Sequence, residues 1–157
     1  MLFRLAHGVS GYEDAPRAIA QRVLEPLVDS MRVDALGNLI TFKKGTGDAN
    51  GKHRTIMLAA HMDEIGMMVT GYSGGFLRVF RVGGSDPRTL VGQEVVVHGV
   101  RDFPGVIASR PPHVLSAEER KKTPDWDDLY VDIGATADEI EGLVTIGDTI
   151  TDRKSVV

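Results

Sequence analysis

An uncharged run that ends in a histidine constrains the fold of this chain more than any other feature. Residues 55–60, Thr-Ile-Met-Leu-Ala-Ala, carry no charge and are mostly aliphatic. Such a run is typical of a strand that is buried on both faces inside a parallel sheet. We therefore expect an α/β domain in which this strand lies at the centre of the sheet.

Polar residues follow this run at once. In an extended chain His61 and Asp63 point to the same side and Glu64 to the other, because side chains alternate with a period of two. In open α/β sheets ligands gather at the carboxyl ends of the strands. An imidazole that binds a metal needs a partner on its other nitrogen, and Asp63 can fill that role or bind the metal directly. The alternative interpretation is a surface histidine beside an acidic turn.

The composition limits the classes of function. The 157 residues suit one domain or two small ones. With 18 basic and 22 acidic residues the net charge is −4, which gives little support for binding nucleic acid or an anionic membrane. Cysteine is absent, so a metal would have to be held by histidine and carboxylates. No apolar stretch could span a bilayer and no secretory pattern is present, so we expect a cytoplasmic protein.

The residues before the apolar run predict one helix and one hairpin. Ser10 and Glu13 have the spacing of a capping box, so a helix is expected from residue 12 or 13 onward. Pro26 should end or kink that helix. Two short β-type runs, 31–34 and 39–42, flank a Gly-Asn pair and predict a hairpin.

After Gly66 the pattern changes to short β-type runs separated by glycines. Regular short strands with turn signals between them predict a small barrel or sandwich, and place a domain boundary near Gly66. Two capping patterns, at Ser116 with Glu119 and at Thr136 with Glu139, predict short helices inside it. The predicted strands are 67–70, 76–80, 94–97, 105–108, 129–132 and 143–145.

Six longer motifs stand in a recognisable order and spacing. They are His7-Gly-Val-Ser-Gly-Tyr-Glu13, Val33-Asp34-x-x-Gly37-Asn38-Leu39, Ala60-His-Met-Asp-Glu-Ile-Gly66, Gly83-Gly-x-Asp86-Pro87-Arg88, Pro111-Pro-His-x-Leu-Ser-x-Glu-Glu-Arg120 and Asp128-Leu-Tyr-Val-Asp-Ile-Gly-Ala135. Together they resemble the N-terminal half of the dinuclear-metal aminopeptidases that form tetrahedral dodecamers. That family includes glutamyl and deblocking aminopeptidases and members labelled endoglucanase.

The resemblance implies an α/β metallopeptidase catalytic domain with an inserted small β-barrel that serves as lid and dimerisation domain. Residues 1–66 would be the N-terminal part of the catalytic domain, residues 67–152 the barrel, and residues 153–157 the start of the return. His61 would be a metal ligand, and Asp63 the carboxylate of the catalytic site that orients it. The family implies two divalent cations per site, zinc or cobalt, peptide substrates, and a homo-oligomer formed through the barrel.

The chain also departs from the family pattern. The bridging aspartate, the Glu-Glu pair with the general base, a further aspartate and the last histidine would all follow the barrel, and the sequence ends at Val157. None of Glu118-Glu119, Asp127-Asp128 and Asp132 matches those motifs. Two hypotheses follow: a metal-dependent aminopeptidase fragment that is inactive alone and binds metal weakly, or a non-catalytic association module left by truncation.

The remaining histidines and one turn suggest structural roles. His98, at a predicted strand end, is expected to be exposed, and His113 to be structural in a barrel loop. His7 and His53 are expected to face solvent or to cap. Asp86-Pro87-Arg88 is expected to form a turn, with a partner contact as the alternative.

Overall fold

A computed structural model describes residues 6–47 and 54–153, and contacts divide the chain into two compact units, residues 1–63 and 64–157. His53 lies outside the described residues, as does all of the predicted return at 153–157 except Arg153. Among the described residues, no helix is both long and apolar enough to cross a bilayer.

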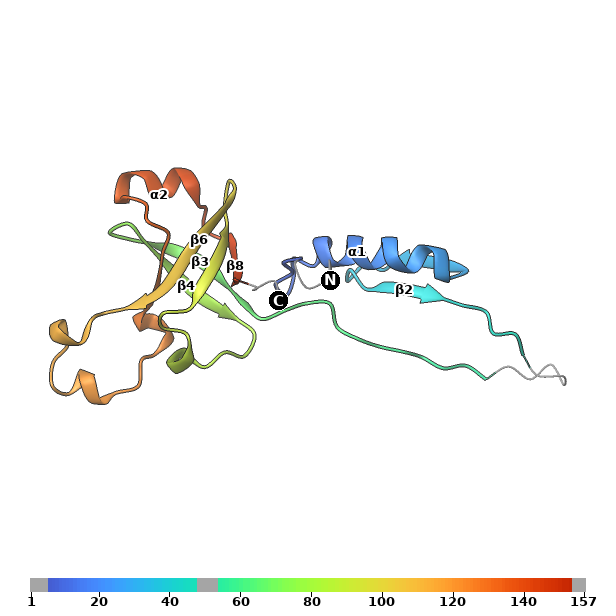
Figure 1. The fold of residues 1–157 in the computed structure, drawn as a ribbon, viewed down its shortest axis with the longest axis horizontal. Coiled ribbons are helices and arrows are strands. Elements are labelled where there is room, and N and C mark those ends of the chain that lie inside the picture. Colours follow the sequence, from blue (N-terminus) through green and yellow to red (C-terminus); the bar gives the residue numbers. More distant parts are fainter. Residues whose placement is uncertain (1–5, 48–53, 154–157) are drawn as a thin grey trace. The chain divides into compact units, whose positions relative to one another are not determined.

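The first unit holds one helix and one hairpin (Figure 1). Helix α1 (Asp14–Leu24) continues into a 3₁₀ turn, η2 (Glu25–Leu27), which contains Pro26, so the predicted end of the helix is confirmed. Strands β1 (Ser30–Val33) and β2 (Leu39–Phe42) pair antiparallel, as predicted. The Asp34 carboxylate closes the turn between them by accepting hydrogen bonds from the backbone N–H groups of Leu36 and Asn38.

The predicted capping box at the start of α1 is wrong. The N-cap is Glu13 rather than Ser10, and no side chain caps the helix. Instead Tyr12 N–H bonds to Val9 C=O at 2.7 Å in a turn that precedes the helix, and Gly11 has a φ of +91°. Glycine adopts that left-handed conformation without the steric cost that other residues meet. Ser10 therefore sits in a turn, where its hydroxyl cannot reach the helix as a cap does.

The buried strand predicted at residues 55–60 is also not observed. These residues form neither helix nor strand, and Figure 1 shows them as an extended segment. Ile56, Met57 and Leu58 are 82%, 87% and 92% exposed. A strand requires a neighbour to pair its backbone groups, and none of the described residues pairs with this segment. An apolar run by itself therefore does not produce a buried strand.

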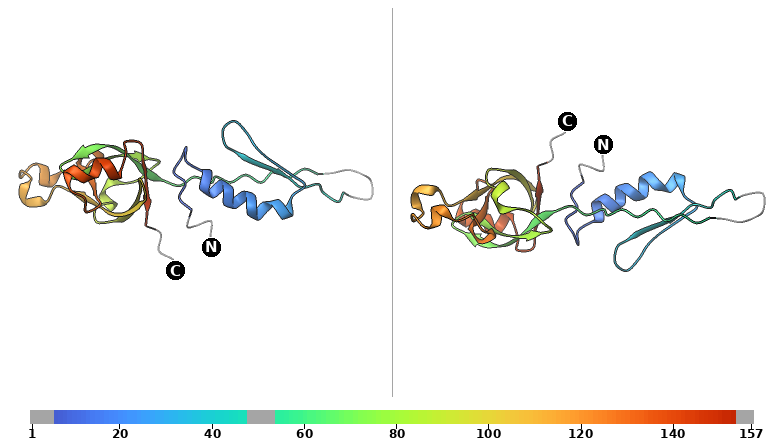
Figure 2. Two further views of the ribbon diagram at one scale, coloured as in Figure 1. Left: turned by 90° about the horizontal axis from the view of Figure 1, so that it is seen from above. Right: turned by 90° about the horizontal axis from the view of Figure 1, so that it is seen from below.

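The second unit is a closed barrel of six antiparallel strands in the order β3-β4-β7-β6-β5-β8 (Figure 2). The sequence left a barrel and a sandwich as alternatives, and the structure is a barrel. Closure leaves no free sheet edge. The strands are β3 (Gly66–Ser73), β4 (Phe76–Val82), β5 (Glu94–His98), β6 (Asp102–Ser109), β7 (Leu129–Asp132) and β8 (Thr149–Asp152).

Three of the connections between successive barrel strands, β4–β5, β6–β7 and β7–β8, contain short helices. Helix α2 (Ala137–Leu143) begins with the predicted capping box, formed by Thr136 and Glu139. The Ser116–Glu119 pattern also forms its reciprocal hydrogen bonds, but only a 3₁₀ turn follows it. The 3₁₀ turns are η3 (Pro87–Thr89), η4 (Pro112–Val114), η5 (Glu119–Lys121) and η6 (Trp126–Asp128).

One predicted strand is misplaced. Residues 143–145 end helix α2 and lead out of it, and the last barrel strand is β8 instead. Val144 is fully buried, so the apolar run does pack on the core, but from the end of a helix.

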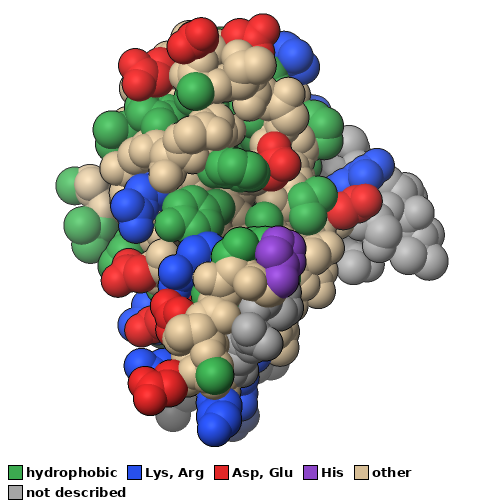
Figure 3. All heavy atoms as spheres, turned by 90° about the vertical axis from the view of Figure 1, so that its left-hand side faces the viewer, with side chains coloured by type: hydrophobic (Ala, Val, Ile, Leu, Met, Phe, Trp, Pro, Cys, Tyr) green, Lys and Arg blue, Asp and Glu red, His purple; other side chains and the backbone are tan. Residues whose placement is uncertain are grey.

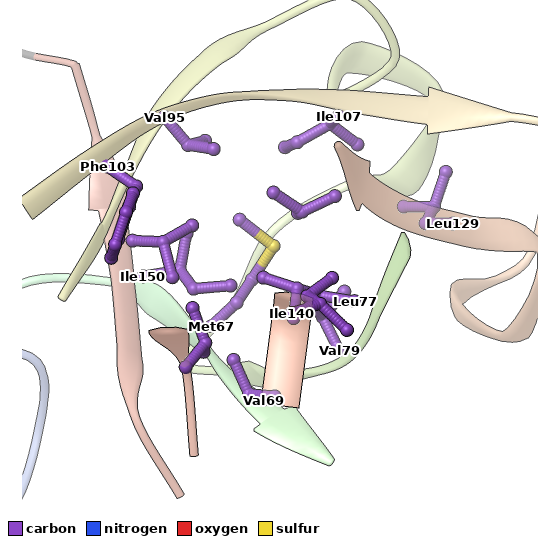
Figure 4. Close-up of a cluster of buried hydrophobic side chains, with 13 residues drawn as sticks. Met67, Val69, Leu77, Val79, Val95, Phe103, Ile107, Leu129, Ile140 and Ile150 are labelled. Carbon is purple, nitrogen blue, oxygen red and sulfur yellow. The ribbon is translucent and has the colours of Figure 1, made fainter. Parts of the chain in front are cut away.

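The barrel interior is a single cluster of thirteen buried side chains, shown in Figure 4. Strand β4 illustrates why it forms: Leu77 and Val79 are buried, whereas Phe76, Arg78 and Phe80 between and beside them are exposed. Each such aliphatic side chain contributes about 1.5–3 kcal/mol when fully buried. The cluster comprises Met67, Val69, Leu77, Val79, Val95, Val97, Phe103, Ile107, Leu129, Val131, Ile140, Val144 and Ile150.

Candidate functional site

The candidate site lies in the first unit, where the apolar segment ends. The ring nitrogen Nδ1 of His61 is 3.0 Å from Oδ1 of Asp63 and 2.9 Å from the Asp63 carbonyl oxygen. Both partners are acceptors, so Nδ1 carries the proton and donates it. Nε2 of the neutral ring then keeps its lone pair, which is the form in which histidine binds metals. The His61 side chain is 84% exposed.

The Asp63 carboxylate is held on both of its oxygens. Oδ1 accepts from His61, and Oδ2 accepts a short hydrogen bond from the hydroxyl of Ser10, 53 positions away in the sequence. The Ser10 hydrogen bond, followed by that of His61, lowers the pKa of the Asp63 carboxyl below its ordinary value of 3.8. The group is therefore ionised at neutral pH, which is the state that can orient a protonated ring nitrogen.

The structure brings together the two residues that the sequence singled out and adds a third. His61 and Asp63 are in contact, although the backbone that carries them is not a strand. Ser10 was not predicted to belong to the site, because its local pattern pointed to a helix cap. No local signal could have revealed a contact with Asp63 over so long a separation.

Three of the five acidic residues considered as substitute ligands, Glu119, Asp128 and Asp132, have partners of their own. Glu119 and Asp128 both approach the Arg110 guanidinium, at 3.3 and 3.4 Å. Asp132 accepts a hydrogen bond from Gly134 N–H at 2.8 Å. Within residues 6–47 and 54–153, no three His, Cys, Asp or Glu residues gather in a group that could hold a metal ion.

His98 differs from its prediction. Its side chain is only 11% exposed, because the end of β5 lies between two neighbouring strands. Nδ1 is 2.8 Å from Oδ1 of Asp102 on β6, and Nε2 is 2.9 Å from Oγ1 of Thr151 on β8. The residue joins three strands of the barrel and is not the exposed strand end that was expected. His113, by contrast, is exposed.

The turn at Asp86 forms as predicted. Asp86 caps η3 by accepting from Arg88 N–H at 3.0 Å, and its carboxylate also faces the Arg88 guanidinium. These hydrogen bonds lower the pKa of Asp86 to about 2.

The donor set at His61 fits one ligand position of a metal site. An imidazole with a carboxylate on its other nitrogen is the arrangement typical of ligands to zinc and related ions. A closed or catalytic site needs at least two further protein ligands. His61 and Asp63 therefore fit part of a metal site, and the other ligands would have to come from residues outside those described.

Comparison with known proteins identifies the family. The model of the M42 glutamyl aminopeptidase family matches residues 37–157. The chain belongs to this family. The lysyl aminopeptidase of Pyrococcus furiosus is 37% identical over 136 residues, which are 84% of this chain and 38% of that protein. The sequence resemblance to these aminopeptidases is thereby confirmed.

Solved structures show the same relationship. The TET aminopeptidase of the marine sediment archaeon Thaumarchaeota archaeon SCGC AB-539-E09 superposes with a TM-score of 0.87 at 38% identity, over 99% of this chain and 44% of that one. The TET1 peptidase of Pyrococcus horikoshii, which can assemble into a tetrahedron or a large octahedral shell, gives a TM-score of 0.79 at 38% identity, over 98% of this chain and 45% of that one. The chain thus spans less than half the length of these relatives.

Proposed function

We propose that this chain is the part of a metal-dependent aminopeptidase that supplies one metal ligand, His61, and the carboxylate that orients it, Asp63. Membership of the M42 family supports the reaction class. The observation that carries the assignment is the hydrogen bond from Nδ1 of His61 to Asp63, since it leaves Nε2 available to a metal. The substrate would be the N-terminal residue of a peptide.

Each residue has a defined task in this proposal. His61 binds through Nε2, and Asp63 keeps the ring in one tautomer and one orientation. When bound, divalent cations, which we propose to be two zinc or cobalt ions, supply the Lewis acidity that polarises a carbonyl and activates water. The general base and the remaining ligands would come from residues outside this chain. We therefore expect the 157-residue chain alone to be inactive.

The two units would have different roles in the complete protein. Residues 1–66 and 153–157 would belong to an α/β catalytic domain, which the barrel at 67–152 interrupts as a lid. The exposed segment at 55–60 would then be covered by sheet strands from the rest of that domain. Its three exposed apolar side chains support this proposal, since an apolar segment of this kind is normally covered in a folded protein.

The barrel supports an association role, either within such an enzyme or as the only function of the chain. Phe76 and Phe80 project outward from β4 and are 41% and 61% exposed. The ring of Phe76 packs edge to face against the ring of Tyr130 on β7, and the Arg78 guanidinium lies over the same tyrosine ring. Figure 3 shows hydrophobic side chains exposed on one face of this unit. We propose that homo-oligomers form through the barrel. Self-association is supported by the related Pyrococcus horikoshii peptidase, which can assemble into a tetrahedron or a large octahedral shell.

A chimera tests the enzymatic proposal. Residues 1–157 would replace the corresponding segment of the Thaumarchaeota TET aminopeptidase, and turnover of aminoacyl chromogenic substrates would be measured with zinc or cobalt. We expect turnover by the chimera, its loss in His61→Ala, and no turnover by the 157-residue chain alone. An assembled chimera whose activity is unchanged by His61→Ala would refute the proposal. Activity of the isolated chain that depends on His61 would show that a substitute set of ligands exists.

A further inference from the structure

The turn before helix α1 contains Ser10, whose hydroxyl does not cap the helix. Gly8 packs closely on Pro16 of α1, so closely that a Cβ built on Gly8 would lie 2.6 Å from Cγ of that proline. Val9, the next residue, is buried. The turn closed by Tyr12 N–H and Val9 C=O then follows, with Ser10 and Gly11 as its two central residues. The backbone on both sides of Ser10 is thereby held.

Glu13 also departs from the capping-box arrangement, because it binds the backbone of Gly11 and not that of Ser10. In a capping box the glutamate reaches the backbone N–H of the serine. Here its Oε1 accepts from Gly11 N–H at 2.7 Å instead, and the serine makes no cap. The Ser10 hydroxyl is therefore available to another acceptor, and the acceptor that it contacts is Oδ2 of Asp63.

The contact matters because Asp63 has two oxygens and only one of them faces the ring of His61. A carboxylate held by a single hydrogen bond can rotate about its side-chain torsions, whereas a second donor on the other oxygen fixes its plane. Groups that do not touch a metal, but hydrogen-bond to the residues around it, affect how a metal ligand is oriented. Ser10, His61 and Asp63 all lie in the unit of residues 1–63.

We propose that Ser10 is a positioning residue of the His61 site: its hydroxyl holds the Asp63 carboxylate in the orientation that keeps Nδ1 of His61 protonated and Nε2 free for a metal ion. This inference rests on the aminopeptidase function proposed above, in which His61 is a metal ligand. It adds a contact from the start of the chain to a site that otherwise lies within three residues of sequence.

Nuclear magnetic resonance of the isotopically labelled 157-residue chain, without metal, tests the inference directly. Three-bond couplings report whether χ1 of Asp63 occupies one rotamer or averages among several. The ring nitrogen shifts of His61, assigned with a His61→Gln variant, report which nitrogen carries the proton at a pH where the ring is neutral. Neither measurement requires substrate or turnover.

Three variants separate the role of the hydroxyl from a general structural effect. In Ser10→Ala we expect χ1 of Asp63 to average and the ring nitrogens of His61 to shift partway toward the Nε2-protonated tautomer, because the Asp63 carbonyl oxygen still accepts from Nδ1. Ser10→Thr keeps a hydroxyl and should retain the wild-type couplings and shifts. Ser30→Ala removes an exposed hydroxyl from β1 in the same unit and serves as the matched control, with an unchanged spectrum.

An unmoved Asp63 rotamer or unmoved His61 shifts in Ser10→Ala would overturn the inference, as would a Ser10→Thr variant that behaves like the alanine variant. Equal changes in Ser30→Ala would also overturn it, because the effect would then not depend on this hydroxyl. The outcome is separable from that of the proposed function. An active chimera with no Ser10 effect refutes only the positioning role, and a Ser10 effect beside an inactive chimera refutes only the function.

Discussion

Truncating Ile107 to alanine should destabilise the barrel far more than truncating its neighbour Val106. Ile107 lies in the core and is fully buried, whereas Val106 points outward from the same strand and is 43% exposed. Ile107→Ala removes three carbons, worth about 0.8 kcal/mol each in transfer free energy, and leaves a cavity as well. We expect a loss of about 3–4 kcal/mol in the free energy of unfolding, within the usual range for such truncations. Val106→Ala should cost roughly 0.5 kcal/mol, as exposed substitutions do.

The chain contains its own probe for this experiment. Trp126 is the single tryptophan, and it packs against the barrel core. Its fluorescence during urea titration therefore follows unfolding of the barrel. The two variants and the parent chain would be compared through their midpoints and slopes, since a change of midpoint at constant slope measures stability.

The reasoning would be refuted by Ile107→Ala and Val106→Ala variants with similar midpoints. A loss below about 1 kcal/mol for Ile107→Ala would have the same meaning, because deletions from well-packed cores cost more than that. Either result would show that β6 does not place Ile107 inside a packed barrel.

Three further predictions concern protection, metal binding and pH. Amide hydrogen exchange should be slower at residues 94–97, which pair within the barrel, than at residues 55–60, which have no strand partner among the described residues. Equal protection would mean that a partner chain covers residues 55–60. Calorimetry with zinc should show no sub-micromolar site, because His61 and at most one carboxylate do not make a tight site, and two such sites per chain would contradict this. Because the pKa of Asp86 is lowered to about 2, its interaction with Arg88 should be fully present above pH 3.8 and be lost as the pH falls through 2. In Arg88→Ala, carboxyl NMR should show the pKa of Asp86 returning toward 3.8.

Most strands of the barrel were predictable, although not its closure, because alternation along a strand indicates which side chains are buried. Leu77 and Val79 alternate with outward side chains, and the period of two identifies the strand and its inner face. Strand β8 was missed because its four residues have one aliphatic side chain, Ile150, between two buried threonines. Residues 143–145 looked more like a strand, but Leu143 ends helix α2 and the next two residues lead out of it.

The candidate site was predictable only in part. The spacing of His61 and Asp63 was sufficient to predict their contact, because two side chains two positions apart on an extended backbone share a side. The contact of Ser10 with Asp63 depends on tertiary structure, and a competing local pattern concealed it. The run at residues 55–60 shows the opposite failure. Its hydrophobicity predicts burial, but burial also needs neighbouring strands, which a local pattern cannot supply.

The metal content of the purified chimera tests the central claim most directly. The chimera of residues 1–157 with the remainder of the Thaumarchaeota TET aminopeptidase would be assembled, freed of loose metal by gel filtration, and analysed by elemental mass spectrometry. The account predicts about two divalent ions per subunit, as in other two-metal peptidase sites, and a reduced content in His61→Ala with assembly unchanged. A His61→Ala chimera that keeps its full metal content would contradict the claim that His61 is a metal ligand.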